Sequence, residues 1–432
     1  MRIRRISASQ EELSNFLREN SAAMRKYQKS VEEIGDLIKA QGNSALFDLT
    51  RKYDGAKLDE SNYKASSKDI ETAYTLTDSA YLEALRVSIS NIRSFHTKQM
   101  RTSWMEPDVF GNILGQIYRP LERAGVYVPG GTAAYPSSVL MNAIPAQVAG
   151  VKEIAMVSPP DKYGKLNPYT LVAAAELGLT EIYKLGGAQA VFALGWGTET
   201  IKKVDIISGP GNIYVTLAKK MVYGDVNIDM LAGPSEILIV ADENANPKYI
   251  AADLLSQAEH DALARSILVC NNEALLDIVE TELAEQIPRL TRKDIILQAL
   301  EHNGAFILTE SLEQSCRTAN KIAPEHLELM VEQPFSALHL IRNAGAIFLG
   351  PNTPEPVGDY YAGPNHILPT GGTARFYSPV TADTFRKASS IIYYSKAGLK
   401  EGADKIVKLA EVEGLTAHAN AIRIRGQHNV EC

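Results

Sequence analysis

The chain has 432 residues, of which 45% are hydrophobic and 22% are charged, and its formal net charge is −7. Because a chain of this length is too long to fold around a single hydrophobic core, we expect at least two domains. The mild acidity, with lysines and arginines spread along the chain, argues against general binding to nucleic acid or to anionic membranes.

The chain contains three cysteines, Cys270, Cys316 and Cys432. Their odd number and wide spacing fit neither a disulfide framework nor a CxxC metal site, so we expect free thiols in a reducing compartment. The N-terminal segment is basic but lacks the apolar stretch of a signal peptide, and no run reaches the roughly 18–20 apolar residues of a membrane span. These features predict a cytoplasmic protein, or an organellar one without its transit peptide.

The first hundred or so residues are predicted to be helical, because residues 11–41 and 78–100 carry apolar side chains at helical spacing. From about residue 120, short apolar runs rich in β-branched residues alternate with helix-like segments, which indicates βαβ units and parallel sheets. After about residue 380 the helical pattern returns. The strands expected in a first sheet are 153–158, 181–185 and 204–208, with helices at 167–177, 188–194 and 212–223; those of a second sheet are 236–240, 266–270, 305–308 and 344–349.

The predicted fold is therefore α/β, with two Rossmann-like parallel-sheet domains, a helical N-terminal region and a small helical C-terminal extension. Ligands commonly bind where such sheets present their strand ends, so a cleft between the two sheets is expected to hold the site. The expected borders are 1–105 for the N-terminal region, which contributes to the first α/β domain, 106–235 for that domain, 236–378 for the second and 379–432 for the extension.

Three strand ends lead into glycine-rich turns, and each turn opens a helix-like segment. The turns are YVPGGT at 127–132, GGAQ at 186–189 and GPGN at 209–212. Glycine lets the backbone approach a ligand closely, and a helix N-terminus offers free N–H groups to a phosphate. None of the turns matches GxGxxG, and each alone is typical of an ordinary βα connection. Together they favour a nucleotide or another phosphate-bearing ligand, without distinguishing NAD from ATP or a sugar phosphate.

A set of nitrogen- and oxygen-bearing side chains could bind a metal. Gln257 and His260 are three residues apart in a helix-like stretch and would share one helix face. Asp359 lies in a loop rich in proline and glycine at 350–372, and His418 lies near the end of the chain. Such ligands suit zinc or manganese better than copper. Taken alone, each residue is better explained by an ordinary polar or surface role, and spacing does not establish that they meet.

Glu325 and His326 form a candidate catalytic pair. They follow Pro324, which restricts the backbone, and precede the strand-like segment 327–331. Histidine is the natural general base near neutral pH, and a glutamate can orient or deprotonate water. A Glu-His dipeptide on the surface is the alternative that these residues alone leave open.

Taken together, the motifs resemble the histidinol dehydrogenase family over nearly the whole chain. The stretches that carry the resemblance, in the family's order, are GVYVPGG, YPSSVLMNAIPA, GGAQA, ISGPGN, GPSE at 233–236, LLSQAEH, APEHLEL, GDYYAGPNHILPTGG and LTAH near the end.

The resemblance implies a set of site residues and cofactors. It implies that Glu325 and His326 are catalytic and that 106–235 is the NAD-binding domain. It further implies one zinc ion per subunit, bound by Gln257, His260, Asp359 and His418. The implied substrate contacts are Ser235, Gln257, His260, His326, Asp359, His366, Glu413 and His418, and the implied NAD contacts are Tyr127, Gln189 and Asn212.

The activity implied by the resemblance is the four-electron oxidation of L-histidinol to L-histidine through L-histidinaldehyde, with two NAD, as the last step of histidine biosynthesis. Glu325 would activate water, His326 would be the general base, and zinc would anchor the substrate. The resemblance also implies a homodimer in which the C-terminal segment of each subunit crosses to its partner.

Three other readings of the sequence compete. One is a related zinc and NAD dehydrogenase acting on another polar alcohol, such as a sulfonated diol; the presence of Glu413 and His418 argues against it. The second is a zinc hydrolase, in which the glycine-rich turns would have no purpose. The third is a non-catalytic metal- or nucleotide-binding module.

Overall fold

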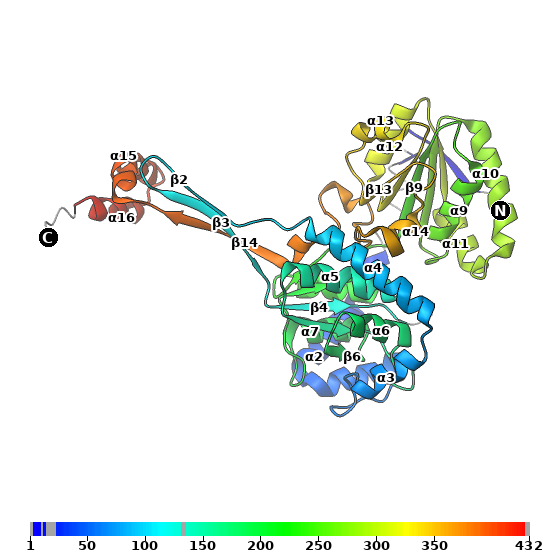
Figure 1. Ribbon diagram of the computed structural model, residues 1–432, viewed down its shortest axis with the longest axis horizontal. Helices are drawn as coiled ribbons and strands as arrows, with labels where there is room; N and C mark the ends of the chain where they lie inside the picture. The colour runs from blue at the N-terminus through cyan, green and yellow to red at the C-terminus, as the bar shows by residue number, and fades with distance from the viewer. Residues whose placement is uncertain (1–2, 10–11, 14–22, 131–134, 428–432) are drawn as a thin grey trace. The chain divides into compact units, whose positions relative to one another are not determined.

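The computed structural model describes residues 3–9, 12–13, 23–130 and 135–427 (Figure 1). The chain divides into two compact units, one of residues 1–99 with 121–385 and one of residues 100–120 with 386–432. The predicted α/β class with two parallel sheets is confirmed, and the borders expected within the chain stay a prediction. No helix in the described parts of the chain is long and apolar enough to cross a membrane. Residues 131–132 of the first glycine-rich turn and Cys432 lie outside the described residues.

The first sheet of the larger unit has five parallel strands in the order β6-β5-β4-β7-β8. The strand order reverses at β4, which pairs with β5 on one side and β7 on the other, and ligands bind at such reversal points in open α/β sheets. The central strands are buried along their whole length, which explains their continuous apolar runs. The strands are β4 (Arg123–Tyr127), β5 (Glu153–Val157), β6 (Glu181–Tyr183), β7 (Ile206–Ser208) and β8 (Asn227–Ile228).

Helices surround this sheet, and two of them begin where their asparagines predict. Asn167 caps α6 and Asn212 caps α8, each accepting a hydrogen bond from the first turn. The N-terminal helix α2 packs against α7 and α8, and α3 packs against α6. The helices are α2 (Ala23–Asp54), α3 (Ser67–Thr75), α4 (Ser79–Thr97), α5 (Pro136–Ala149), α6 (Pro168–Glu176), α7 (Gly187–Trp196) and α8 (Ile213–Val222).

The second sheet has six parallel strands in the order β1-β11-β10-β9-β12-β13, with the same reversal at β9. One of its two edge strands, β1, comes from the N-terminal region, which the sequence predicts to be helical. The strands are β1 (Arg4–Ser7), β9 (Glu236–Ala241), β10 (Arg265–Cys270), β11 (Ala305–Leu308), β12 (His326–Met330) and β13 (Ala346–Leu349).

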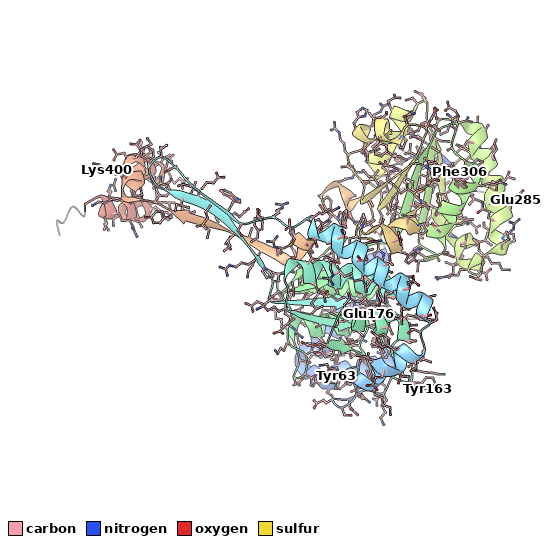
Figure 2. The ribbon with its side chains drawn as sticks, viewed as in Figure 1. Tyr63, Tyr163, Glu176, Glu285, Phe306 and Lys400 are labelled. Carbon is pink, nitrogen blue, oxygen red and sulfur yellow. The ribbon has the colours of Figure 1, made fainter. Side chains whose placement is uncertain are left out.

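Successive residues of the second sheet face different hydrophobic cores. Ile237 and Ile239 pack with α9, α10 and α11, and Phe306, marked in Figure 2, belongs to the same core. Leu238 and Val240 pack with α12 on the opposite face. The larger helices are α9 (Pro247–Ala258), α10 (Glu273–Gln286), α11 (Lys293–Asn303) and α12 (Leu312–Ile322). The short ones are η1 (Ile287–Arg289), α13 (Pro334–Ala337), η2 (Leu338–Leu340), α14 (Glu355–Val357), η3 (Gly358–Ala362), η4 (Thr373–Arg375) and η5 (Ala382–Phe385).

The smaller unit is an antiparallel sheet, β14-β3-β2, with two helices. The expectation of helix after residue 380 is wrong for β14, which pairs along its length with β3. Ser395, at the start of α15, donates its N–H to the Asn112 Oδ1 beside β3 at 3.0 Å, which ties the helices to the sheet (Figure 1). The elements are β2 (Trp104–Pro107), β3 (Ile113–Pro120), β14 (Arg386–Tyr393), α15 (Lys396–Val412) and α16 (Thr416–Gln427).

Candidate active site

Glu325 and His326 lie at the amino end of β12, which pairs with β9 on one side and with the edge strand β13 on the other. Helix α12 ends in a left-handed residue, Ala323, with φ 53°, and Pro324 then leads the chain into the strand. Glu325 is 6% exposed and His326 is 4% exposed, so the pair is not a surface dipeptide. The site therefore lies at the amino ends of these strands, whereas the glycine-rich turns leave the carboxyl ends of the first sheet.

The backbone of Glu236, at the start of the neighbouring strand β9, orients both side chains. Its N–H donates to Glu325 Oε2 at 2.8 Å, and its carbonyl oxygen lies 3.0 Å from His326 Nδ1. A carbonyl can only accept, so Nδ1 carries the proton and Nε2 of a neutral ring is left with its lone pair. His326 Nε2 is buried without a hydrogen-bond partner, 4.0 Å from Asp359 Oδ1. An imidazole nitrogen with a free lone pair can accept a proton or bind a metal.

Burial shifts the pKa values of the pair in opposite directions. It lowers the pKa of His326, which keeps the ring neutral and able to take a proton. Burial, with the nearby carboxylates of Glu236, Asp359 and Glu355, raises the pKa of Glu325 well above its usual range. A raised pKa makes the Glu325 carboxylate a stronger base than an exposed glutamate, so it takes up a proton more readily.

Three side chains beside this pair form a candidate metal centre. One ligand atom from each of His260, Glu355 and Asp359 lies within 4.8 Å of the others. Gln257, on the last turn of α9, is fully buried, and both atoms of its amide lack a partner. Buried amides are normally hydrogen-bonded, so this amide is explained by a group that the structure does not hold. The donors fit a divalent cation with nitrogen and oxygen ligands.

Local structure differs from the sequence expectation at two of these residues. Helix α9 ends at Ala258, so His260 lies in the following turn, where its N–H donates to the Gln257 carbonyl at 3.2 Å, and not on the helix face itself. Asp359 lies in the π-helical turn η3 directly after α14, not in an irregular loop. Within that helical segment, Glu355 and Asp359 are four residues apart and share one face.

Glu355 is the residue of this cluster that the sequence reasoning missed. Its N–H donates to Glu328 Oε1 at 2.9 Å, and its Oε2 accepts from the Ser256 hydroxyl at 3.0 Å. Asp253 and Glu328 hydrogen-bond to each other, and burial raises the pKa of both. The four-residue spacing from Asp359 is the signal that could have identified Glu355, had the segment been predicted as helix.

His366 and Ser235 also border the pair. His366 Nδ1 lies 3.7 Å from Asp359 Oδ1. Burial, with the imidazoles of His326 and His260, lowers the pKa of His366 to about 3. Ser235 immediately precedes β9 and is half-buried next to Glu236. Both residues thus lie with the catalytic pair at one end of the sheet.

The two remaining candidates, Glu413 and His418, belong to the smaller unit. Glu413 is the C-cap residue directly after α15 and His418 is in the first turn of α16, and both side chains are exposed. The structure therefore gathers His260, Asp359, His326 and His366 within the larger unit. It assigns the other two predicted residues to the unit that carries the C-terminal helices.

The three predicted NAD-contacting residues border the strand reversal of the first sheet. Tyr127 ends β4, and its hydroxyl oxygen accepts from the Gly187 N–H at 3.0 Å. Gln189 follows in α7, buried, with its Nε2 unpartnered. Asn212 caps α8 and is exposed. Two glycines of these turns, Gly130 and Gly186, pack so closely on Pro159 that a Cβ would clash, so they also serve the packing of the turns.

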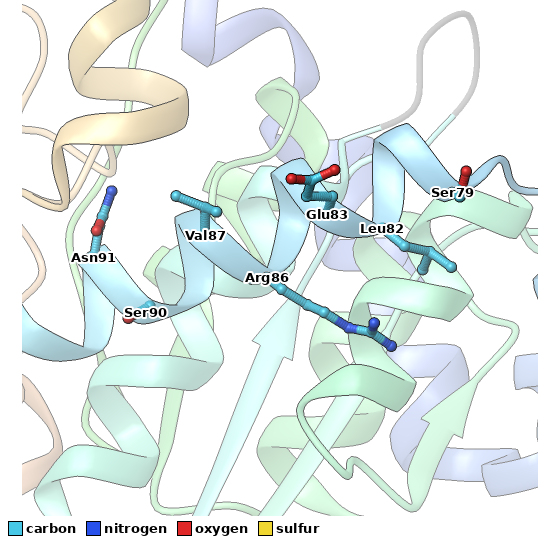
Figure 3. A pocket seen from close by; sticks show the side chains of 7 residues that line it. All are labelled: Ser79, Leu82, Glu83, Arg86, Val87, Ser90 and Asn91. Atoms are coloured by element: carbon cyan, nitrogen blue, oxygen red, sulfur yellow. The ribbon is translucent and has the colours of Figure 1, made fainter.

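A hollow of about 470 Å³ elsewhere on the larger unit does not have the features of this site. Seven residues of α4 line it, as Figure 3 shows. Its charged members are Glu83 and Arg86, and Arg86 pairs with Glu176 at 2.8 Å. We therefore do not place the chemistry there.

The chain is similar to known proteins over nearly its whole length. The sequence model of the family described as histidinol dehydrogenase matches residues 17–426. Histidinol dehydrogenase of Heliobacterium mobile is 53% identical over 98% of this chain and 99% of its own. That of Carboxydothermus hydrogenoformans is 52% identical over 96% and 98%. A crystal structure of histidinol dehydrogenase from Elizabethkingia anophelis matches with a TM-score of 0.94 at 39% identity, covering 98% of each chain.

Proposed function

Because the chain belongs to the histidinol dehydrogenase family, a family of oxidoreductases, we propose that it oxidises L-histidinol to L-histidine through L-histidinaldehyde with two NAD, as the last step of histidine biosynthesis. The observation that supports this most directly is the free, buried Nε2 of His326 beside Glu325 and the His260–Glu355–Asp359 cluster. The relatives do not favour a dehydrogenase of sulfonated diols.

His326 acts as the general base in this proposal. Its Nε2 removes the hydroxyl proton from the alcohol while the hydride leaves for NAD, the acceptor in both oxidations. The hydrogen bond from Nδ1 to the Glu236 carbonyl keeps the ring in the reactive tautomer. It also stabilises the imidazolium that forms when the proton arrives.

Glu325 activates water for the second half of the reaction. The aldehyde must be hydrated before it can lose a second hydride, and a buried carboxylate beside it can take the proton from the attacking water. Its hydrogen bond from the Glu236 N–H fixes one oxygen and leaves the other for the water. As the water adds, the imidazolium of His326 returns its proton to the aldehyde oxygen, which completes the gem-diol and leaves the ring neutral. His326 then removes a proton from the gem-diol as it did from the alcohol.

Gln257, His260 and Asp359 would bind zinc, one ion per subunit, with His418 as the fourth ligand. When bound, zinc supplies a positive charge that anchors the imidazole and amine of the substrate. An amide oxygen is a neutral donor, so Gln257 would leave more of that charge for neutral substrate nitrogens. Ser235, His366 and Glu413 are proposed to complete the substrate pocket.

Tyr127, Gln189 and Asn212 are proposed to contact NAD. Their position at the strand reversal of the first sheet and the unpartnered amide of Gln189 support this assignment. The protein is proposed to be a homodimer in which the C-terminal segment crosses to the partner, and to act in the cytoplasm. The free, buried thiols of Cys270 and Cys316 are compatible with a reducing compartment.

The stoichiometry of the reaction tests the proposed function. We expect about two NADH for each L-histidinol consumed, with turnover lost on chelation and restored by zinc. One NADH per substrate, or turnover that a sulfonated diol supports better than histidinol, would contradict the proposal.

A further inference from the structure

A buried ion pair lies directly beneath the GPGN turn. Lys219, in α8, has a side chain that is 3% exposed, and Asp229, just after β8, has one that is 1% exposed. Lys219 Nζ donates to Asp229 Oδ1 and, at 2.9 Å, to the Gly209 carbonyl oxygen. Lys219, in the helix that follows this turn, therefore hydrogen-bonds to Gly209, the first residue of the turn.

Asp229 holds the other side of the same residue. Its Oδ2 accepts from the Gly209 N–H at 2.8 Å, and its Oδ1 accepts from the Met230 N–H at 2.6 Å. The Ser208 hydroxyl, 3.4 Å from Oδ2, donates to Asn142 Oδ1 at 2.6 Å and links the pair to α5. Both peptide groups of Gly209 are therefore fixed by the two halves of one ion pair.

Gly209 needs this support because its conformation is one that other residues rarely adopt. Its φ is 129°, and a Cβ at this position would lie 2.1 Å from the Tyr127 carbonyl oxygen. The turn thus lies against the end of β4, where the strand order reverses and where Tyr127, Gln189 and Asn212 are found.

A buried ion pair is an inefficient way to stabilise a core, because desolvation offsets much of the attraction and an apolar pair often serves as well. What an apolar pair could not do is hold a peptide N–H and a peptide carbonyl at fixed positions. We propose that Lys219 and Asp229 are positioning residues of the cofactor site, which hold the turn at 209–212 in the shape that receives NAD. This inference rests on the proposed use of NAD.

Two variants, Asp229→Asn and Lys219→Met, test the proposal, with Arg123→Met as the matched control. Arg123 is also buried and forms ion pairs with Glu153 at 2.8 Å and Glu181 at 2.6 Å, but at the amino ends of the strands, the opposite edge of the same sheet. We expect KM for NAD to rise at least about tenfold in both test variants, with kcat and KM for histidinol within about threefold. Arg123→Met should lower the melting temperature and leave KM for NAD unchanged.

A double variant, Lys219→Met with Asp229→Leu, separates positioning from stability. It removes both charges, so its melting temperature should recover towards that of the wild type, whereas KM for NAD should stay raised. This variant also keeps the test open should a single variant fail to fold. NAD titrated into the protein without histidinol, followed by calorimetry, gives a second reading that does not depend on turnover.

Two results overturn the inference and are distinguishable. If the wild type oxidises histidinol with NAD but the folded variants keep its KM for NAD and its NAD affinity, the positioning role is wrong and the proposed function stands. If the wild type neither binds NAD nor reduces it with histidinol, the proposed function fails, and the inference fails with it.

Discussion

At the scale of one residue, Gln257, a proposed metal ligand, carries a cost in stability when no ion is bound. Its amide is buried with neither atom hydrogen-bonded, and such groups destabilise a fold by about 1–3 kcal/mol. Leucine has a similar size and no polar atoms. Gln257→Leu should therefore raise the free energy of unfolding of the metal-free protein by about 1–2 kcal/mol in urea denaturation. The same variant should no longer be stabilised by added zinc, because the ligand that binds the folded state is lost.

Gln147 provides the matched control for this prediction. Its Nε2 donates to the Leu177 carbonyl at 2.7 Å, and its Oε1 accepts from Arg93 at 2.8 Å. Gln147→Leu should therefore lower stability and leave the effect of zinc intact. If Gln257→Leu were less stable than the metal-free wild type, the amide would have partners in the fold and no need of an ion.

Asp54, at the end of helix α2, should make the stability of the protein depend on pH. It is the last residue of α2, its Oδ2 is buried without a partner, and burial raises its pKa from 3.8 to about 6. The folded state thus prefers the protonated form. Its contribution is fully present below pH 3.8 and is lost as the pH rises through 6.

Asp54→Asn should remove this dependence. At pH 8 the variant should be more stable than the wild type by about 1 kcal/mol, after allowance for solvent screening, and at pH 3.5 the two should be alike. Asp48→Asn, an exposed change on the same helix, should give no such difference between the two pH values. A wild type that is the more stable protein at pH 8 would show that Asp54 has a favourable partner when charged.

At the scale of elements, backbone strain lies directly before the candidate catalytic pair at the entry to β12. Ala323 is the one non-glycine residue with a positive φ among those described, and it is fully buried. A left-handed conformation costs an L-residue about 1–2 kcal/mol, and more when the side chain is β-branched. We expect Ala323→Val to lower the free energy of unfolding by about 2 kcal/mol and to lower kcat, because Glu325 and His326 follow within three residues.

Ala323→Gly is the control for this strain. Glycine relieves the Cβ clash but loses more backbone entropy on folding, so its stability should lie within about 1 kcal/mol of the wild type with kcat preserved. Urea denaturation and NADH formation measure both variants. Equal stability of the valine and glycine variants would mean that the turn relaxes without cost.

Elements with a local signal were predictable, and elements that depend on distant partners were not. Asn167 and Asn212 mark the starts of α6 and α8 because an asparagine cap acts on the residues directly after it. Strand β14 was missed because most of its side chains are exposed, so no alternation marks it, and its partner β3 lies far earlier in the chain. Strand β1 likewise pairs with β11, about three hundred residues away.

In the candidate site, too, residues with a local sequence signal were predicted, and those that depend on distant parts of the fold were not. Glu325 and His326 were identified from residue chemistry and a neighbouring proline, and the resemblance to a family supplied the ligand set. Glu355 was missed because its proximity to His260 depends on the helical turn between Glu355 and Asp359, and proline and glycine in this segment led us to expect a loop. The orienting role of the Glu236 backbone has no sequence signal, since any residue has an N–H and a carbonyl.

At the scale of the whole molecule, the smaller unit carries several large apolar side chains that are mostly exposed to solvent. Val109 is 93% exposed, Val412 74%, Ile392 72% and Leu409 68%. Exposed apolar side chains such as these could be covered by another protein, and a second copy of the chain is the simplest such partner. The proposed homodimer would cover them and would supply Glu413 and His418 to the partner's site.

Mixing two inactive variants tests this exchange. His326→Ala and His418→Ala should each lower kcat by a factor of about 10² to 10⁴ as homodimers. In a mixed dimer, one site would lack both histidines, and the other would have both, with His326 from one subunit and His418 from the other. Because half the dimers formed at equal amounts are mixed and each has one intact site, about a quarter of the wild-type activity should return.

A second pair of variants shows whether mixing subunits restores activity for reasons other than an exchange of the C-terminal segment. His326→Ala and His260→Ala lie in the same unit of the chain, so every site in their mixed dimers lacks one of the two histidines, and no activity should return. If His418 instead served its own subunit, the first pair would behave like this control, since each subunit would carry one lesion in its own site. Recovery in the first pair alone therefore requires that the C-terminal helix of one copy complete the active site of the other.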